Sequence, residues 1–242
     1  RQAGTKAHAS TKQITDEQIA QLSVHPDIVH FGKSIVLGTA KNQCLAGRQV
    51  ELRYGSDQYA RDAFAYPTTG RMPEQKDEIA LDTQVLARLG ISPELGQPVT
   101  LEWENGSDTF TLCGWWEGNL SSYAGMAWVS EAYAREACES VPEPKDGQML
   151  GLRMMGITFS DTRNIDAKTR KVLSESGLTG LQFQTNLAYT PEVQSGILAE
   201  NLPMYGGMML VFLAGYLIIY NVFQISVAAD IQFYGKLKTL GT

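Results

Sequence analysis

The sequence predicts an α+β domain followed by a single transmembrane α-helix. Segments with strand-like and helix-like patterns alternate irregularly through about the first 200 residues, which is typical of the α+β class. Residues 201–229, in contrast, contain no Asp, Glu, Lys or Arg. The chain has 242 residues, 43% of them hydrophobic and 19% charged, so the first part is long enough to bury a core. Together these observations indicate two parts adapted to two different solvents.

Turn and cap residues place the elements of the first part in order. We expect a helix over 15–23 with Thr15 as N-cap, strands over 28–37 and 49–54, and a short helix over 57–64. A strand over 78–81 precedes a helix over 83–89 that Gly90 ends. Alternating residues on both sides of Asn105-Gly106 predict a hairpin with strands over 99–104 and 107–114.

The remaining elements follow the same logic. We expect a strand over 126–129, a helix over 131–138, a strand over 150–159, a helix over 164–176 that ends at Gly177, and a strand over 181–185. This order suggests a split βαβ layer, interrupted by a smaller sheet-bearing insert at about 57–145. The predicted organisation is therefore an outer domain over 1–200, a transmembrane helix over 201–229 and the start of a cytoplasmic segment over 230–242.

The apolar segment from Met204 to Val227 predicts the membrane span. As a helix rising about 1.5 Å per residue it would be roughly 36 Å long, enough to cross the hydrocarbon core. A buried core helix is the alternative, but such helices usually keep a polar side and this segment is apolar nearly all round. Glu192 and Glu200 precede the span and Lys236 and Lys238 follow it, so residues 1–200 are expected outside the cell membrane.

Small and polar residues recur on one stripe of this helix. Gly207, Ala214 and Asn221 are seven residues apart, and Gln224 follows Asn221 by three. Small residues allow close helix approach, and an amide at membrane depth favours a hydrogen bond to another helix. We therefore predict helix packing through Gly207, Ala214, Asn221 and Gln224. In the alternative interpretation the two amides reach water at the cytoplasmic interface.

The segment after the span has an amphipathic pattern. Phe233, Leu237 and Leu240 are spaced for one helix face, with Tyr234 beside them and Lys236 and Lys238 along an edge. Such a face needs a partner, which is either the membrane surface or a protein beneath it.

Composition and motif searches exclude several function classes. The chain carries 20 basic and 26 acidic residues without a basic cluster, which argues against nucleic-acid binding. No catalytic, nucleotide-binding or EF-hand motif is present, and the three histidines are scattered, so we expect no catalytic, cofactor or metal site. The cysteines, Cys44, Cys113 and Cys138, are interpreted as small buried hydrophobes, or one pair as a disulfide. Trp103, Trp115, Trp116 and Trp128 indicate a core, or the lining of a ligand groove.

Two sets of motifs resemble a known family. Residues 226–242, SVAADIQFYGKLKTLGT, are similar to the segment after the second transmembrane helix of FtsX/MacB-type ABC transporter permeases, in a Firmicutes-like variant that departs from the consensus at Asp230 and at 233–235. GRMP at 70–73, DEIAL at 77–81, LG at 89–90 and LGQPVTL at 95–101 resemble the periplasmic core domain of the same permeases. The matches cover about 66–242.

The resemblance implies a fold and a role. The outer domain would be a MacB-like core domain with a porter-like layer and a sabre-like insert, and we expect the chain to continue at both ends into further transmembrane helices. The subunit would not be an enzyme and would bind no cofactor. It would transmit ATP hydrolysis by a cytoplasmic ABC ATPase to an outer domain, which is called mechanotransmission, for export, release or signalling.

The same resemblance implies partners. These are the ATPase, a second or homologous permease copy, the lipid bilayer and an unidentified extracytoplasmic client. The residues implied to contact the ATPase are Phe233, Tyr234, Leu237, Lys238 and Leu240. The main alternative function is a membrane-anchored extracellular ligand-binding sensor, and an anchored hydrolase comes third because no catalytic motif is present.

Overall fold

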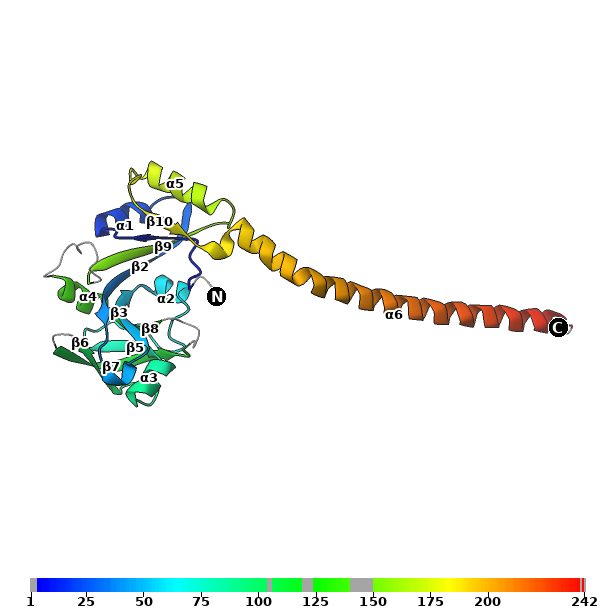
Figure 1. The fold of residues 1–242 in the computed structure, drawn as a ribbon, viewed down its shortest axis with the longest axis horizontal. Helices are drawn as coiled ribbons and strands as arrows, with labels where there is room; N and C mark the ends of the chain where they lie inside the picture. The colour runs from blue at the N-terminus through cyan, green and yellow to red at the C-terminus, as the bar shows by residue number, and fades with distance from the viewer. Residues whose placement is uncertain (1–3, 104–105, 119–123, 140–149, 240, 242) are drawn as a thin grey trace. The chain divides into compact units, whose positions relative to one another are not determined.

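A computed structural model describes residues 4–103, 106–118, 124–139, 150–239 and 241, with the side chains of 191–201, 237 and 239 left aside. It divides into two units, residues 1–189 and 190–242. Figure 1 shows the elements of the first unit and the long helix of the second. The strands are β1 (Ala9–Lys12), β2 (Ile28–Thr39), β3 (Gln49–Gly55), β4 (Thr69–Gly70), β5 (Glu78–Asp82), β6 (Pro98–Trp103), β7 (Gly106–Trp116), β8 (Ala124–Val129), β9 (Leu152–Phe159) and β10 (Phe183–Thr185). The helices are α1 (Asp16–Ser23), η1 (Gln43–Leu45), α2 (Asp57–Asp62), α3 (Thr83–Leu89), α4 (Glu131–Cys138), α5 (Ile165–Glu175), η2 (Leu187–Tyr189) and α6 (Pro191–Thr239).

The ten described strands form one mixed sheet. Their order is β10-β1-β9-β2-β3-β8-β5-β7-β4, and β6 pairs with β7. The pairs β3–β8 and β5–β7 are parallel and the others antiparallel. The α+β class predicted from the sequence is confirmed. The strands of the predicted insert, β4 to β8, continue the sheet because β8 pairs with β3 from Gln49↔Ala124 to Tyr54↔Val129. The proposed division into core and insert stays a prediction.

The predicted strands and helices of the first unit all form, with small shifts at their ends. The hairpin strands appear as β6 and β7, and their pairing ends at Trp103↔Gly106. The turn residue Asn105 and the predicted end of the insert, at about 145, lie outside the described residues. The structure adds β1, a four-residue strand between β9 and β10 that the sequence analysis missed. Its sequence, ASTK, lacks the alternation of large apolar residues that marks a strand.

Side-chain caps fix the helix ends where the sequence predicted them. Thr15 forms a complete capping box with Gln18 at the start of α1, a motif that satisfies two backbone N–H groups at once. Asp82 caps α3 by accepting a hydrogen bond from the Val85 backbone N–H at 2.8 Å. Gly90 ends α3 in the left-handed region at φ 73°, which costs glycine little.

The helices cover the two faces of the sheet unequally. On one face α1 and α5 enclose a core with β1 and β9 that includes Leu22, Ile157 and Val172. On the other face α2 lies against β2 so closely that a Cβ at Gly32 would lie 2.5 Å from the Tyr59 backbone nitrogen. Figure 1 shows α3 beside β5 and β7 at the far end of the sheet. This packing leaves a hollow on the sheet beyond α2.

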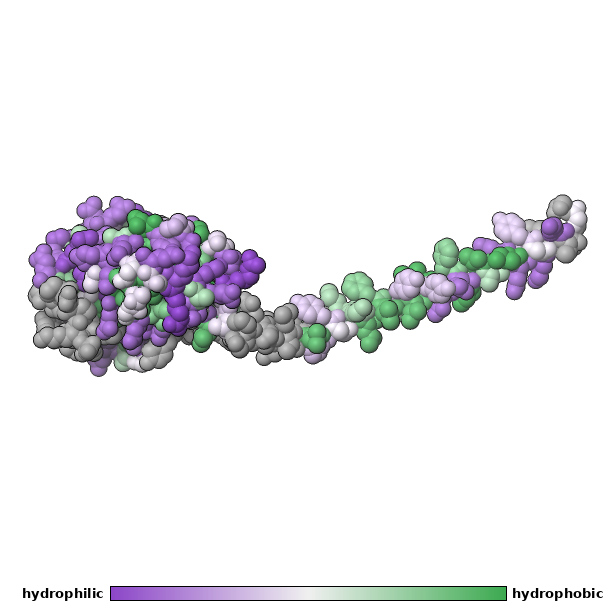
Figure 2. Space-filling model, turned by 90° about the horizontal axis from the view of Figure 1, so that it is seen from above, coloured by the Kyte–Doolittle hydropathy of each residue, from purple (hydrophilic) through white to green (hydrophobic). Residues whose placement is uncertain are grey.

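The second unit is dominated by α6. This helix has 49 residues, and its stretch from Leu202 to Lys236 is long and apolar enough to cross a membrane. None of that hydrophobic window is buried within the structure. Figure 2 shows hydrophobic surface along the middle of the helix and polar residues towards its C-terminal end. The helix begins at Pro191, earlier than the predicted span, and it continues through Pro203.

Candidate functional site

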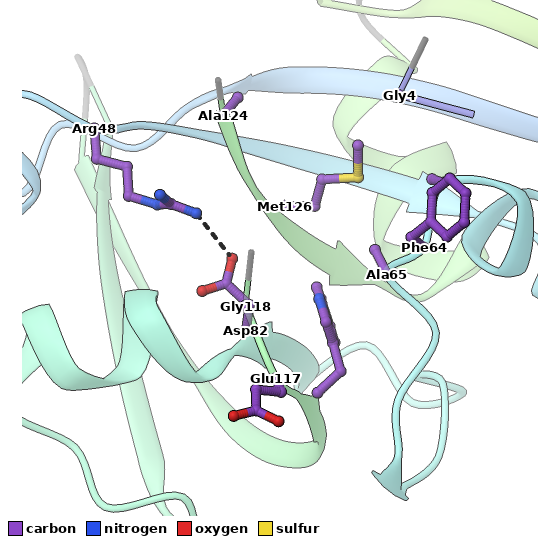
Figure 3. Close-up of a pocket in the computed structure, with 11 residues that line it drawn as sticks. Gly4, Arg48, Phe64, Ala65, Asp82, Glu117, Gly118, Ala124 and Met126 are labelled. Carbon is purple, nitrogen blue, oxygen red and sulfur yellow. Dashed lines mark ion pairs between the residues drawn. The ribbon is translucent and has the colours of Figure 1, made fainter. Parts of the chain in front are cut away.

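The hollow beyond α2 is a cavity of about 400 Å³ (Figure 3). Six separate parts of the chain line it. Arg48 comes just before β3, Asp82 ends β5, Trp116 ends β7, and Met126 lies on β8. The loop after α2 supplies Ala63, Phe64 and Ala65, and the remaining lining residues are Gly4, Glu117, Gly118 and Ala124.

Arg48 and Asp82 form a buried ion pair at one side of this cavity. The Arg48 Nη2 and the Asp82 Oδ2 are 3.7 Å apart, and the two side chains are only 9% and 4% exposed. Burial raises the pKa of Asp82 above its ordinary value, and the hydrogen bond from Val85 and the charge of Arg48 oppose that shift. Asp82 therefore holds α3 in place and balances the Arg48 charge.

Backbone geometry around Asp82 requires glycine. A Cβ at Gly118 would lie 2.7 Å from the Asp82 Oδ1, and a Cβ at Gly125 would lie 2.8 Å from the Val85 Cγ2. Any larger residue at these two positions would displace the carboxylate or the first turn of α3. The glycines thus keep the polar side of the cavity in its shape.

The opposite side of the cavity is apolar. Trp116, Met126, Ala65 and Phe64 present carbon surface, and Figure 3 shows Phe64, Ala65 and Met126 across the space from Arg48. The four tryptophans lie in the core or pack against it, and one of them also lines the cavity. Trp116 lines the cavity, while Trp128 is fully buried and its indole N–H donates to the Ala65 carbonyl at 2.7 Å. The core interpretation holds for both, because Trp116 is only 5% exposed and packs in the same buried cluster as Trp128.

A second polar cluster ties α4 to the sheet. Glu131 accepts hydrogen bonds from the Lys33 Nζ and the Arg135 Nη2, both at 2.8 Å, and from the Tyr54 hydroxyl at 3.0 Å. Burial alone would raise the pKa of Glu131, but these three donors outweigh it and lower the pKa to about 2. Because every member has a partner, this cluster is structural.

A group of potential metal ligands also appears that the sequence analysis did not find. The ligand atoms of His25, Asp27 and Glu175 all lie within 4.8 Å of one another. The Lys171 ammonium already lies in this group, 2.8 Å from Asp27 and 3.8 Å from Glu175. The group is accordingly an ion-pair network between α5 and the loop before β2.

All three cysteines are free thiols. Cys138 is buried, Cys113 is half-buried and Cys44 is exposed. Burial raises the pKa of Cys113 to about 12, so its thiol stays protonated and unreactive at neutral pH. The interpretation as small buried hydrophobes fits Cys113 and Cys138 but is wrong for Cys44, which lies in the short helix η1.

The residues predicted to pack against other helices all lie on α6. Gly207, Ala214, Asn221 and Gln224 are exposed within the structure. The Gln224 Nε2 donates to the Tyr220 hydroxyl at 2.8 Å, one turn earlier. This bond uses one of the two amide hydrogens, which leaves the other and the amide oxygen for a neighbouring helix. Helix packing through this stripe remains a prediction.

Four of the predicted coupling residues, Phe233, Tyr234, Leu237 and Lys238, lie at the C-terminal end of the same helix. Phe233 and Tyr234 are 61% and 69% exposed, and Lys238 is exposed as well. The Leu237 side chain and the whole of Leu240 lie outside the described residues. The helical pattern expected for this segment is confirmed, since α6 extends to Thr239.

Comparison with known proteins gives structural likeness only. Neither a family model nor a curated protein matches the sequence. The extracellular domain of the noncanonic ABC-type transporter YknZ from Gram-positive bacteria is 14% identical, with 71% of this chain and 88% of that chain covered at a TM-score of 0.46. The periplasmic region of MacB from Actinobacillus actinomycetemcomitans is 13% identical, with 76% and 91% covered at a TM-score of 0.44.

A third structure is a domain of a Porphyromonas gingivalis protein described as a permease. It is 10% identical, with 79% of this chain and 96% of that chain covered at a TM-score of 0.47. At such low identity the likenesses concern the fold alone, and with TM-scores below 0.5 no function is inferred from them. A functional assignment therefore has to come from the residues of the chain itself.

Proposed function

We propose that the chain is part of an FtsX/MacB-type ABC transporter permease subunit that couples ATP hydrolysis by a cytoplasmic ATPase to movement of an extracytoplasmic domain. The order of motifs supports this proposal. The GRMP, DEIAL and LGQPVTL segments lie in the α+β unit, and residues 226–239 of the other matching segment form the end of the apolar helix. In this arrangement α6 anchors the protein in the membrane with the α+β unit outside.

The continuity of α6 is the main structural support for this proposal. The helix runs without interruption from the apolar, uncharged stretch through Lys236 to Thr239. An α-helix holds every backbone polar group in internal hydrogen bonds, so it can cross lipid as one element. A force applied by the ATPase at Phe233 and Tyr234 would then be carried along the same helix to the outer side.

The role of the exposed aromatic pair follows from its surroundings. Phe233 and Tyr234 are large apolar side chains on the same helix end as Lys236 and Lys238. An exposed apolar face with a basic edge is suited to a protein groove. We infer that this face contacts the ATPase together with Leu237 and Leu240, and that the stripe of Gly207, Ala214, Asn221 and Gln224 contacts other permease helices.

The coupling assignment can be tested in reconstituted membranes that contain the permease and its ATPase. Phe233→Asp and Leu237→Asp should leave ATP hydrolysis by the ATPase intact but abolish nucleotide-dependent movement of the outer domain, measured between spin labels. Gln232→Asp is the matched control, because it adds the same charge one residue away from Phe233. Movement that persists in both variants would contradict the coupling role.

The second candidate function is a membrane-anchored extracellular ligand-binding sensor, and the Arg48 cavity is the observation that favours it. The two candidates differ in their inner partner. Purification in detergent from the native host should recover an ABC ATPase with the wild-type protein but not with Phe233→Asp. Recovery of a signalling kinase instead would favour the sensor.

A further inference from the structure

Arg48 carries hydrogen-bond donors that no described residue uses. The side chain is 9% exposed, and its Nε and Nη2 are buried without a hydrogen-bond partner among the described residues. The Asp82 carboxylate lies 3.7 Å away, which is an ion-pair distance but too long for a hydrogen bond. Since burying an unused donor costs free energy, an acceptor from outside the protein would be stabilised there.

The charges around the cavity indicate which kind of ligand group could accept hydrogen bonds from Arg48. Asp82 already balances the guanidinium, and Glu117 adds a second carboxylate to the lining. A ligand carboxylate at Arg48 would therefore be repelled by Asp82 and Glu117. A neutral carbonyl oxygen accepts the same hydrogen bonds without that repulsion, so the polar side of the cavity fits an amide.

The apolar lining of the cavity indicates which chemical group would be attached to this carbonyl. Trp116, Met126 and Phe64 offer apolar surface opposite the guanidinium, as Figure 3 shows for Phe64 and Met126. A volume of about 400 Å³ lies within the range of ligand sites. One large apolar side chain together with its own peptide carbonyl would occupy this space.

We propose that the cavity binds a polypeptide segment by inserting one aromatic or large aliphatic side chain between Trp116 and Met126, while the adjacent backbone carbonyl accepts hydrogen bonds from Arg48. Nothing in this site requires the permease assignment. Binding would also stabilise the α+β unit, because the acceptor satisfies donors that are otherwise buried without a partner.

The probe for this site is N-acetyl-phenylalaninamide, which has one aromatic side chain, two amide carbonyls and no charge. The whole chain in detergent micelles, labelled with ¹³C at the methionine methyl groups, would be titrated at millimolar concentrations. Only 8 methionines are present, so the Met126 methyl can be assigned. We expect a saturable shift of Met126 and no comparable shift of Met208 or Met209 on α6. That pattern separates the cavity from non-specific uptake into the detergent.

Three variants test the cause of the binding. Arg48→Met should lower the affinity for the probe at least tenfold. Ala124→Leu should abolish binding because the larger side chain fills the cavity, although Arg48 is still present. Arg163→Met, the same change at an exposed arginine, should leave binding unchanged. Because Arg48→Met leaves the Asp82 charge buried alone, the double variant Arg48→Met/Asp82→Asn provides a folded version of the same test.

Each result would either overturn or establish the proposal. No saturable Met126 shift, or equal affinity in the wild type and both arginine-deleted variants, would overturn the proposal. Tighter binding of N-acetyl-phenylalanine, which carries a free carboxylate, would also overturn it and would assign the cavity to anions. Loss of binding in Ala124→Leu and Arg48→Met/Asp82→Asn, with the Arg163→Met affinity unchanged, would establish it.

Discussion

Large apolar side chains are buried in the α+β unit but exposed on helix α6. In the α+β unit Leu101 and Trp128 are fully buried, whereas on α6 Leu213 and Ile218 are 58% and 64% exposed. Polar groups differ in the same sense, because buried polar side chains such as Thr169 and Asn186 in the α+β unit bond to its own backbone. The difference shows that one unit completes its core internally, while the other needs lipid or other helices to cover it.

The largest contrast should appear when a large side chain is truncated in each unit. Trp128→Ala should lower the free energy of unfolding of the α+β unit by about 3–5 kcal/mol, because it leaves a cavity and an unsatisfied Ala65 carbonyl. Phe212→Ala on α6 should leave that transition unchanged. All four tryptophans precede residue 190, so denaturant unfolding followed by tryptophan fluorescence reports this unit alone. A similar loss in both variants would show that Phe212 also stabilises the fold of the α+β unit.

A charge in the middle of α6 should have the next largest effect, and it should appear only in membranes. Leu213→Arg should disfavour insertion by about 2.5–3.5 kcal/mol, since lipid offers the guanidinium no partner. The fraction inserted into microsomes can be measured by carbonate extraction. Leu95→Arg, at a leucine that is 52% exposed on the α+β unit, is the control and should have no effect. Equal insertion of both variants would show that α6 does not enter lipid.

A smaller effect is expected at the capping box. Thr15→Ala removes the acceptor for the Gln18 backbone N–H and should lower the stability of the α+β unit by about 1 kcal/mol. Thr15→Ser keeps the hydroxyl and should recover most of that loss. Denaturant midpoints of the two variants give the comparison. If serine and alanine destabilise the unit equally, the cap is not what holds α1.

The smallest effect is a pH dependence confined to the α+β unit. Burial lowers the pKa of His8 below 6.5, Lys168 lowers it further and Asp161 opposes the shift, while the ring Nδ1 accepts the Phe159 backbone N–H at 3.1 Å. The neutral ring therefore stabilises the fold above pH 6.5, and this contribution is lost as the pH falls below that value. Denaturant midpoints between pH 7.5 and 5.5 should decline less in His8→Gln than in the wild type. His30→Gln, at an exposed histidine, should retain the full decline.

Local signals in the sequence predicted most elements of the α+β unit because they act over a few residues. Thr15, Gly90 and the strand alternation around Gly106 each determine a nearby turn or cap. β1 was missed because its identity as a strand comes from pairing with β9 and β10, more than 140 residues away, and its own residues carry no apolar period. Pairing between distant segments has no local signature.

The residues of the candidate site could not be grouped from the sequence, because they too come together only through contacts between distant segments. Arg48, Asp82, Trp116 and Met126 come from four separate segments, and no motif joins them in the sequence. His25 and Glu175 are likewise brought together only by folding. The apolar span was predictable because it depends on composition alone. An unpaired buried donor such as the Arg48 Nε, in contrast, becomes visible only when every possible partner has been placed in space.

Cysteine labelling in the native membrane can show whether α6 crosses the bilayer with the α+β unit outside. In a background with Cys44, Cys113 and Cys138 replaced by alanine, Leu187→Cys and Gln232→Cys would be treated with a membrane-impermeant maleimide. The impermeant reagent should label Leu187→Cys but not Gln232→Cys in intact cells, and the reverse in inverted vesicles. Labelling of both positions from the same side would contradict it.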